Sequence, residues 1–437
     1  MQTSLRASLR GPLVALASLG ALSGSGTTAL AQNSPLPTAT PQAAGLSSAG
    51  LARMAAAFKV EIDKDRLPGT VIAIARKGKL AYFETQGFRD KAAKAPMTKD
   101  AIFSIASMTK PMVSVAIMML WEEGKVRLND PVSTYLPQMA NRTVAMAKAG
   151  ADGKITYDNV PAKRQPTVQD LLRHTSGIPY GARGDTPIHK MWPGSSAGAA
   201  QEFTSQEFID KIATLPLVTE PGSNWEYSLS VDVLGLIVEK VSGKTLGAFL
   251  SERIWKPLGM VDTSFEVPEA KKGRYARALE NDPTTGKPQT VLHAPGNKPL
   301  KYECGGGCAV STASDYIRFA QMLANGGTLE GKRLLSRKTV EFMTADHLGP
   351  EIVNNVSATE PARKGYGFGL GFAVRRQTGV AAVAGSTGDY NWAGAYGTFF
   401  WVDPKEQLVA VYMSQAPGPI RQQHRALFTD MVLQALD

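Results

Sequence analysis

Cysteine, histidine and long apolar stretches are all scarce in this chain of 437 residues. With only two cysteines and five histidines, the chain cannot have a disulfide-rich scaffold. The cysteine pair also lacks further ligands for zinc, because the nearest histidine is His293. We therefore expect no metal site and no cofactor. Beyond the N-terminal region no apolar stretch is long enough to cross a bilayer, so we expect no transmembrane segment.

Clustered positive charge is also missing, although the formal net charge is +10. Basic residues occur as isolated pairs, such as Lys271-Lys272, Arg337-Lys338 and Arg375-Arg376. A nucleic-acid-binding surface needs a basic stripe or a recognisable module, and this sequence has neither. We interpret the charge as favouring solubility, with weak attraction to anionic envelope surfaces, and expect no nucleic-acid partner.

The N-terminal region has the three parts of a secretory signal peptide. Arg6 and Arg10 give a positive start, Gly11–Leu22 is a short apolar segment, and Ala29-Leu30-Ala31 is a cleavage site of small residues. We predict cleavage after Ala31 and a periplasmic or secreted protein. The next residues, 32–45, are rich in proline, alanine and threonine, and we expect them to be a mobile leader.

The two cysteines, Cys304 and Cys308, lie in the segment C-G-G-G-C. In an oxidising compartment they could form a disulfide that closes a small loop. Two free thiols in a glycine turn fit the same spacing, so the sequence leaves both states open.

The stretch with the clearest chemical pattern is Ile102–Lys110, which reads I-F-S-I-A-S-M-T-K. Ser107 and Lys110 are three residues apart, and an apolar run, P-M-V-S-V-A-I-M-M-L-W, follows them. The run predicts a buried helix from about Ser107 to Glu123, with both side chains on one face of its first turn. A serine needs a base to become a nucleophile, and a lysine can be that base if burial lowers its pKa. The spacing alone occurs about once or twice by chance in a chain of this length, so the buried setting matters.

The order of predicted elements indicates one sheet built from both ends of the chain. A helix over Ser47–Ile62 precedes two strands, Thr70–Ala75 and Leu80–Thr85, which are apolar enough to be covered on both faces. The C-terminal part predicts strands over Gly367–Val374, Val380–Gly385, Ala395–Val402 and Leu408–Ser414, then a helix over Ile420–Leu436. Between these parts the sequence predicts helices over Val168–His174, Gln206–Thr214, Leu229–Lys240 and Leu246–Ile254, with few strands.

We therefore expect an α+β fold: an antiparallel sheet flanked by helices, plus an inserted mostly helical subdomain. Residues 46–437 would form one unit. Its α/β part would span about 46–125 and 305–437, and its helical part about 126–304.

Two further segments contain groups that chemistry at Ser107 could use. The segment E-P-G-S-N-W-E-Y-S contains Tyr227, whose phenol titrates near ten and needs a cationic neighbour, such as Lys110, to act as a base. Residues 385–397, G-S-T-G-D-Y-N-W-A-G-A-Y-G, are rich enough in glycine to let backbone approach a ligand. A free N–H at such a strand edge can form half of an oxyanion hole. Taken alone, Tyr227 also fits a packed aromatic, and the glycine segment fits a plain hairpin.

Together these segments resemble the serine β-lactamase and penicillin-binding-protein superfamily, most closely class C β-lactamases and the family VIII carboxylesterases. The resemblance runs from about Gly45 to the end of the chain. It is carried by F-S-I-A-S-M-T-K, L-L-R-H-T-S-G-I-P-Y, E-P-G-S-N-W-E-Y-S-L-S-V-D-V-L-G, W-K-P-L-G-M-V-D-T-S-F and G-G-G-C-A-V-S-T-A-S-D-Y. It implies a β-lactamase/DD-peptidase-like fold.

The resemblance also implies roles for individual residues. Ser107 would be the acylated nucleophile, and Lys110 with Tyr227 would form the base pair. The oxyanion hole would be the backbone N–H groups of Ser107 and Ala395. The family's third motif falls on Trp392-Ala393-Gly394, and the substrate-binding residues would be Trp392, Gly394 and Tyr180.

Two positions depart from the lactamase pattern. Leu229 stands where a Tyr-x-Asn motif has asparagine, and Trp392 stands where lactamases have a lysine that binds the substrate carboxylate. An aromatic side chain there suits an uncharged acyl or alcohol group. We therefore expect a serine hydrolase that cleaves small carboxylic esters through an acyl-enzyme. The alternatives are a β-lactamase or D-Ala-D-Ala carboxypeptidase that uses the same residues on a lactam or peptide, and a non-catalytic penicillin-recognising protein.

A second serine motif points to a different fold. Residues 194–198, G-S-S-A-G, fit the G-x-S-x-G nucleophile elbow of α/β-hydrolases. That elbow needs an apolar strand before it, and the preceding D-T-P-I-H-K-M-W-P does not predict one. We therefore do not expect Ser196 to be the nucleophile, and we interpret His174 as structural.

Overall fold

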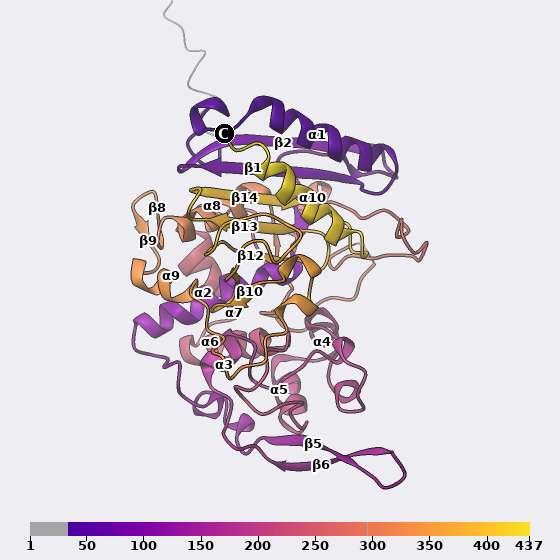
Figure 1. The fold of residues 1–437 in the computed structure, drawn as a ribbon, viewed down its shortest axis with the longest axis vertical. Coiled ribbons are helices and arrows are strands. Elements are labelled where there is room, and N and C mark those ends of the chain that lie inside the picture. Colours follow the sequence, from indigo (N-terminus) through magenta and orange to yellow (C-terminus); the bar gives the residue numbers. More distant parts are fainter. Residues whose placement is uncertain (1–33, 295) are drawn as a thin grey trace, which may run out of the picture. The chain divides into compact units, whose positions relative to one another are not determined.

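The two ends of the chain meet in one eight-stranded antiparallel sheet (Figure 1). The computed structural model describes residues 34–294 and 296–437, so the predicted signal peptide lies outside the described residues. The strand order is β10-β11-β12-β13-β14-β1-β2-β3. The strands are β1 (Gly69–Arg76), β2 (Lys79–Asp90), β3 (Ala95–Pro96), β10 (Tyr366–Phe368), β11 (Ala373–Arg375), β12 (Tyr390–Ala393), β13 (Phe399–Asp403) and β14 (Leu408–Met413). The predicted α+β fold is confirmed.

The central strands β1 and β14 are apolar on both faces because helices cover both sides of the sheet. Along β1, Val71 and Ala73 belong to the larger core cluster, whereas Ile72 and Ile74 belong to a second cluster on the opposite face. Strand β14 alternates in the same way and pairs with β1 in an antiparallel register. Two-sided burial explains the nearly continuous apolar sequence of both strands.

Helices from the two ends of the chain form one layer, and helices from inside the chain form the other. Helix α1 (Ser48–Asp63) and helix α10 (Arg421–Leu433) lie together over the face lined by the second cluster (Figure 1). Helix α2 (Thr109–Glu122) and helix α8 (Ala313–Ala324) pack into the larger cluster. Almost every residue of α2 is buried, because it lies between the sheet layer and the inserted helices.

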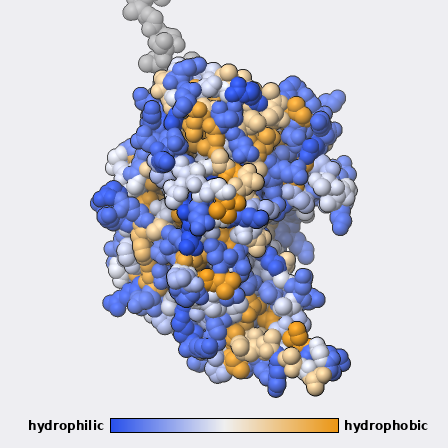
Figure 2. All heavy atoms as spheres, in the orientation of Figure 1, coloured by the Kyte–Doolittle hydropathy of each residue, from blue (hydrophilic) through white to orange (hydrophobic). Residues whose placement is uncertain are grey.

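The inserted region contains five of the remaining helices and one unexpected hairpin. Its helices are α3 (Val168–Leu172), α4 (Ser196–Glu202), α5 (Ser205–Ala213), α6 (Ser230–Ser242) and α7 (Leu246–Leu250), the last continued by a π-helical turn, Ser251–Trp255. The hairpin, β5 (Thr143–Ala149) with β6 (Ile155–Pro161), lies in the region where we expected helices and few strands. Its strands carry the exposed apolar side chains Met146 and Ile155. Elsewhere on the face in Figure 2, apolar residues are scattered among polar ones.

The remaining elements are short. They are β4 (Phe103–Ser104) paired with β7 (Val310–Ser311), β8 (Thr328–Leu329) paired with β9 (Lys332–Arg333), and helix α9 (Arg337–Met343). No helix in the described part of the chain is long and apolar enough to span a membrane.

Several local predictions need correction. The strand predicted over Gly367–Val374 is two strands, β10 and β11, which pair antiparallel. Helix α2 begins at Thr109, not Ser107, because Ala106–Met108 form a 3-10 turn before it. The segment Val380–Gly385 forms no strand, although its neighbours β11 and β12 do. The expected mobile leader is packed from residue 35 onward: Leu36 is buried and the Ala39 N–H donates to the carbonyl of Leu80 at the edge of the sheet.

Candidate active site

Ser107 lies on a tight 3-10 turn between β4 and α2 that several contacts hold in place. Ala106, directly before it, has a φ of 44°, a left-handed conformation that is strained for a residue with a side chain. The Thr109 hydroxyl donates to the Ala106 carbonyl at 2.7 Å and accepts from the Ala309 N–H at 3.1 Å. A strained backbone persists only where its surroundings fix it, and these bonds fix the position of Ser107.

Lys110 is buried beneath Ser107 and has a hydrogen-bond acceptor for each of its three ammonium protons. Its Nζ lies 2.6 Å from the Gly306 carbonyl, 2.9 Å from the Tyr180 hydroxyl and 3.4 Å from the Ser107 Oγ. A neutral amine has only two protons, so one of these acceptors would lose its donor on deprotonation. The geometry therefore favours the charged form of Lys110.

The electrostatics agree with that geometry and correct the sequence analysis. Burial alone would lower the pKa of Lys110, as we expected, but Tyr180, Tyr227 and Asp232 outweigh it and raise the pKa above its ordinary value. Lys110 therefore remains an ammonium at neutral pH. The group whose ionisation this cation favours is Tyr227.

Tyr227 lies just before α6, with its ring 4.6 Å from the Nζ of Lys110. Burial acts to raise the pKa of its phenol, but Lys110, contact with the Ser107 side chain and Arg183 together lower the pKa below its ordinary value. The Trp392 indole N–H also donates to the Tyr227 hydroxyl at 3.3 Å. A phenolate gains from each of these contacts, so the site favours proton removal from Tyr227.

The structure places two of the three predicted substrate-binding residues elsewhere. Tyr180 lines the cleft beside Ser107, but Trp392 is 2% exposed and does not line it. The Trp392 ring is covered by the Arg363 guanidinium at 4.2 Å and by the ring of Tyr227 at 5.1 Å. The Trp392 side chain therefore contacts Tyr227, the candidate base, and does not reach the cleft. Gly394 does not line the cleft either.

The third motif needs glycine at position 394 because the end of β12 packs against the Ser107 turn. A Cβ atom on Gly394 would lie 2.2 Å from the Ile105 carbonyl oxygen, which is an impossible contact. This close approach brings Ala395 to the same cleft as Ser107. Among the hydrogen bonds of the described residues, none uses the backbone N–H of Ser107 or of Ala395. Both donors are therefore available to an oxyanion, as the resemblance implies.

A chain of hydrogen bonds links Lys110 to a buried carboxylate. The Tyr180 hydroxyl, which accepts from Lys110, lies 2.7 Å from the Ser196 Oγ, and Ser196 donates to the Asp232 carboxylate at 2.7 Å. The same carboxylate accepts from the Gly306 N–H at 3.0 Å. Because Asp232 accepts from Ser196, the Tyr180 hydroxyl can donate to Ser196, and every proton in the chain has an acceptor.

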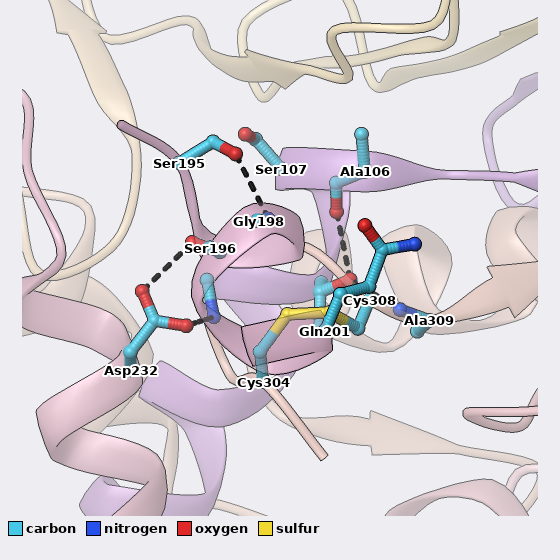
Figure 3. The surroundings of a disulfide bond; sticks show 12 residues. Ala106, Ser107, Ser195, Ser196, Gly198, Gln201, Asp232, Cys304, Cys308 and Ala309 are labelled. Carbon is cyan, nitrogen blue, oxygen red and sulfur yellow. Dashed lines mark hydrogen bonds between the residues drawn. A yellow bond between two sulfur atoms is a disulfide. The ribbon is translucent and has the colours of Figure 1, made fainter. Parts of the chain in front are cut away.

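The glycine loop that carries Gly306 is closed by a disulfide between Cys304 and Cys308, which decides between the two states that the sequence leaves open. Figure 3 shows Asp232 reaching from α6 to Ser196, with the disulfide beside this pair. Position 306 must be glycine, because a Cβ atom there would lie 2.2 Å from the Ser196 Oγ. The loop thus presents one carbonyl to Lys110 and one N–H to Asp232.

The cleft above these groups has a volume of about 520 Å³ and is lined by Ser107, Tyr180, Arg183, Ser196, Tyr227 and Ala395, among others. The sequence analysis missed Arg183, Asp232 and Gly306. Asp232 could have been noticed, since a carboxylate in the run V-D-V-L-G-L-I-V must be buried and therefore bonded.

His174, as expected, is structural: its buried ring packs 4.9 Å from that of Tyr227 and its Nδ1 lies 2.9 Å from the Ser228 Oγ. No group of three or more metal-binding side chains is found in the described part of the chain.

Known proteins that are similar to this chain agree with the site geometry. The sequence model of the family described as Beta-lactamase matches residues 54–431. Esterase EstB of Burkholderia gladioli is 31% identical over 381 residues, covering 83% of this chain and 90% of EstB. Lovastatin esterase of Penicillium rubens is 28% identical over 390 residues, covering 83% of this chain and 92% of that enzyme. The solved structure of EstCE1, described as a hydrolase with promiscuous acyltransferase activity, has a TM-score of 0.71 at 26% identity and covers 88% of this chain and 98% of its own. This chain therefore belongs to the Beta-lactamase family of serine hydrolases, as its motifs predict.

Proposed function

We propose that the protein hydrolyses carboxylic esters through an acyl-enzyme on Ser107. The observation that carries this proposal is the convergence of Ser107, a charged Lys110 and an acidified Tyr227 beneath a cleft of about 520 Å³. Lys110 stays charged, and its charge lowers the pKa of Tyr227, which favours the ionised base that a serine nucleophile requires.

In the acylation step, the Ser107 Oγ attacks the ester carbonyl carbon while its proton passes to the Tyr227 phenolate. The carbonyl oxygen becomes an oxyanion held by the N–H groups of Ser107 and Ala395. The bond to the alcohol then breaks, and the Tyr227 hydroxyl returns its proton to the departing alkoxide. Lys110 keeps its charge throughout and stabilises the phenolate.

In the deacylation step, water takes the place of the alcohol. Water attacks the acyl carbonyl and gives a proton to the Tyr227 phenolate. When the new tetrahedral species collapses, the Ser107 Oγ leaves and recovers the proton from Tyr227. The balance is one ester and one water converted to one acid and one alcohol.

The choice of esters over lactams rests on the relatives that are named as esterases, because the loss of the lactamase lysine at position 392 does not by itself set the charge of the cleft. The lysine that binds a lactam carboxylate in β-lactamases is replaced here by Trp392, whose indole N–H contacts the Tyr227 hydroxyl. EstB and lovastatin esterase, both named as esterases, are relatives over most of the chain. A β-lactamase or D-Ala-D-Ala carboxypeptidase on the same residues is the alternative.

Labelling with a fluorophosphonate, followed by peptide mass spectrometry, tests the nucleophile. We expect the label on the peptide that contains Ser107, and its loss in Ser107→Ala. Turnover of 4-nitrophenyl butyrate is then compared with turnover of a cephalosporin. Faster cephalosporin turnover would favour the alternative, and a label on Ser196 would overturn the proposed site.

A further inference from the structure

Arg183 brings a positive charge into the cleft from a loop outside the family motifs. It lies in the segment between α3 and α4 and lines the same cleft as Ser107. Its guanidinium carbon lies 4.9 Å from the centroid of the Tyr227 ring. The cation is therefore next to the group that exchanges protons with the nucleophile and the leaving alcohol.

Among the described residues, no carboxylate forms an ion pair with this cation. No ion pair among the described residues involves Arg183, and none of the described residues that line the cleft is acidic. In the same loop His189 pairs with Glu226 at 2.8 Å, and the exposed carboxylate of Asp185 forms no ion pair with Arg183 among the described residues. Arg183 is also exposed, and no hydrogen bond among the described residues uses its side-chain N–H donors, so they can bind a ligand.

Trp392 does not set the charge preference of the cleft, because it is buried and does not line the cleft. The sequence analysis expected an uncharged substrate from the missing lysine at that position. The structure supplies a different cation, Arg183, which does line the cleft. A planar guanidinium binds a carboxylate with two parallel hydrogen bonds, which a lysine cannot do.

We propose that Arg183 binds a carboxylate of the substrate, so that the preferred substrates are esters that also carry a free carboxylate. This inference rests on the proposed esterase function and narrows it to a substrate class. The carboxylate belongs either to the acyl part or to the alcohol part of the ester. Both would place an anion beside the ring of Tyr227.

Matched substrates test the inference. The acyl arm compares the mono-4-nitrophenyl ester of glutaric acid with its methyl diester, and the alcohol arm compares 4-acetoxybenzoate with its methyl ester. In at least one arm we expect the free acid to have a kcat/KM about 10-fold higher than its methyl ester at low salt. The arm that shows the preference identifies the part of the ester that carries the carboxylate. High salt should reduce the preference, because the cation is exposed.

Two variants show whether Arg183 causes the preference. Arg183→Gln should reduce the ratio of free acid to methyl ester to near one, and Arg183→Lys should restore part of it. Lys190→Gln makes the same charge change in the same loop at an exposed residue that does not line the cleft, and it should leave the ratio unchanged. Ratios near one in the wild-type protein in both arms, or ratios that Arg183→Gln does not change, would overturn the inference.

A binding measurement separates this inference from the proposed function. In Ser107→Ala the same ester pairs can be titrated by calorimetry without turnover. Tighter binding of a free acid, lost on adding Arg183→Gln, would support the inference even if ester turnover were absent. Equal affinities for both members of each pair would overturn it even if ester turnover were fast.

Discussion

Ser107 and Ser196 both line the same cleft, and both lie where a helix begins, yet their surroundings differ in charge. Ser107 lies above an ammonium and beside a phenol whose pKa is lowered. Ser196 is bonded to the Asp232 carboxylate and to the Tyr180 hydroxyl. Burial raises the pKa of that carboxyl in spite of Lys110, and raises the pKa of the Tyr180 phenol as well.

The comparison shows that the partners of a serine, more than its local motif, decide its chemistry. The hydroxyl of Ser196 already links Tyr180 to Asp232, and only 4% of the surface of Ser196 is exposed. The hydroxyl of Ser107 accepts a long bond from Lys110, contacts the Tyr227 phenol and lines the open cleft. One serine is a structural connector, and the other is free to react.

The largest effect should come from changing the two serines separately. Ser107→Ala should lower kcat on a 4-nitrophenyl ester by at least about 10⁴-fold, because no other group can carry the acyl chain. Ser196→Ala removes a connector and should lower kcat only about 10-fold. Both values come from steady-state rates, with circular dichroism as the control for folding. Equal losses in the two variants would contradict the distinction.

Much of this comparison could be predicted from the sequence, and there is a physical reason why the rest could not. The spacing of Ser107 and Lys110, and the absence of a strand before Ser196, follow from local patterns. The charge state of Lys110 could not be read, because it depends on Tyr180 and Asp232, which are distant in sequence and meet only in the fold. The strands β1 and β14 were predictable from their apolar runs, whereas the β5–β6 hairpin was not, because most of its residues are exposed and no buried face imposes an apolar pattern on it.

Asp232→Asn should give the next largest effect, because it replaces a carboxylate oxygen that only accepts hydrogen bonds by an NH₂ group that donates them. An asparagine can accept from Gly306 N–H only by turning its NH₂ toward Ser196, and the Tyr180 proton then loses its acceptor. We expect kcat to fall about 10- to 100-fold. Asp232 also raises the pKa of Lys110, so its loss should move the high-pH limb of the kcat profile to lower pH.

A double-mutant cycle checks whether Asp232 acts through Ser196. The loss in Asp232→Asn combined with Ser196→Ala should be smaller than the product of the two single losses, since both variants break one chain. Independent effects, or an unchanged high-pH limb, would assign Asp232 to packing alone.

Trp392→Phe should have a smaller effect that appears mainly in the pH profile. The base acts as a phenolate, so kcat/KM should rise with pH through the pKa of Tyr227, which lies below its ordinary value. Removing the indole donor makes the phenolate less favourable, so the rise should move about half a unit to one unit to higher pH.

Trp225→Phe is the matched control for Trp392→Phe. Trp225 stacks 6.2 Å from the Tyr227 ring, but its indole N–H has no hydrogen-bond partner among the described residues. The Trp225→Phe variant should therefore leave the midpoint of the pH profile of kcat/KM unchanged. Equal shifts in the two variants would assign the effect to packing instead of the hydrogen bond.

The smallest effect should come from opening the disulfide beside this network. Replacing both Cys304 and Cys308 by serine frees a loop that is closed over five residues, which should lower the free energy of unfolding by about 2 kcal/mol and the Tm by about 2 °C. The Gly306 carbonyl would also hold Lys110 less firmly, so kcat should fall a few-fold while KM changes less. Reductant should lower the Tm of the wild-type protein but not of the variant. Two thiols that react in the native wild-type protein without reductant would contradict the disulfide, and a variant with unchanged kcat would show that the glycine loop keeps its position through Asp232 and Lys110 alone.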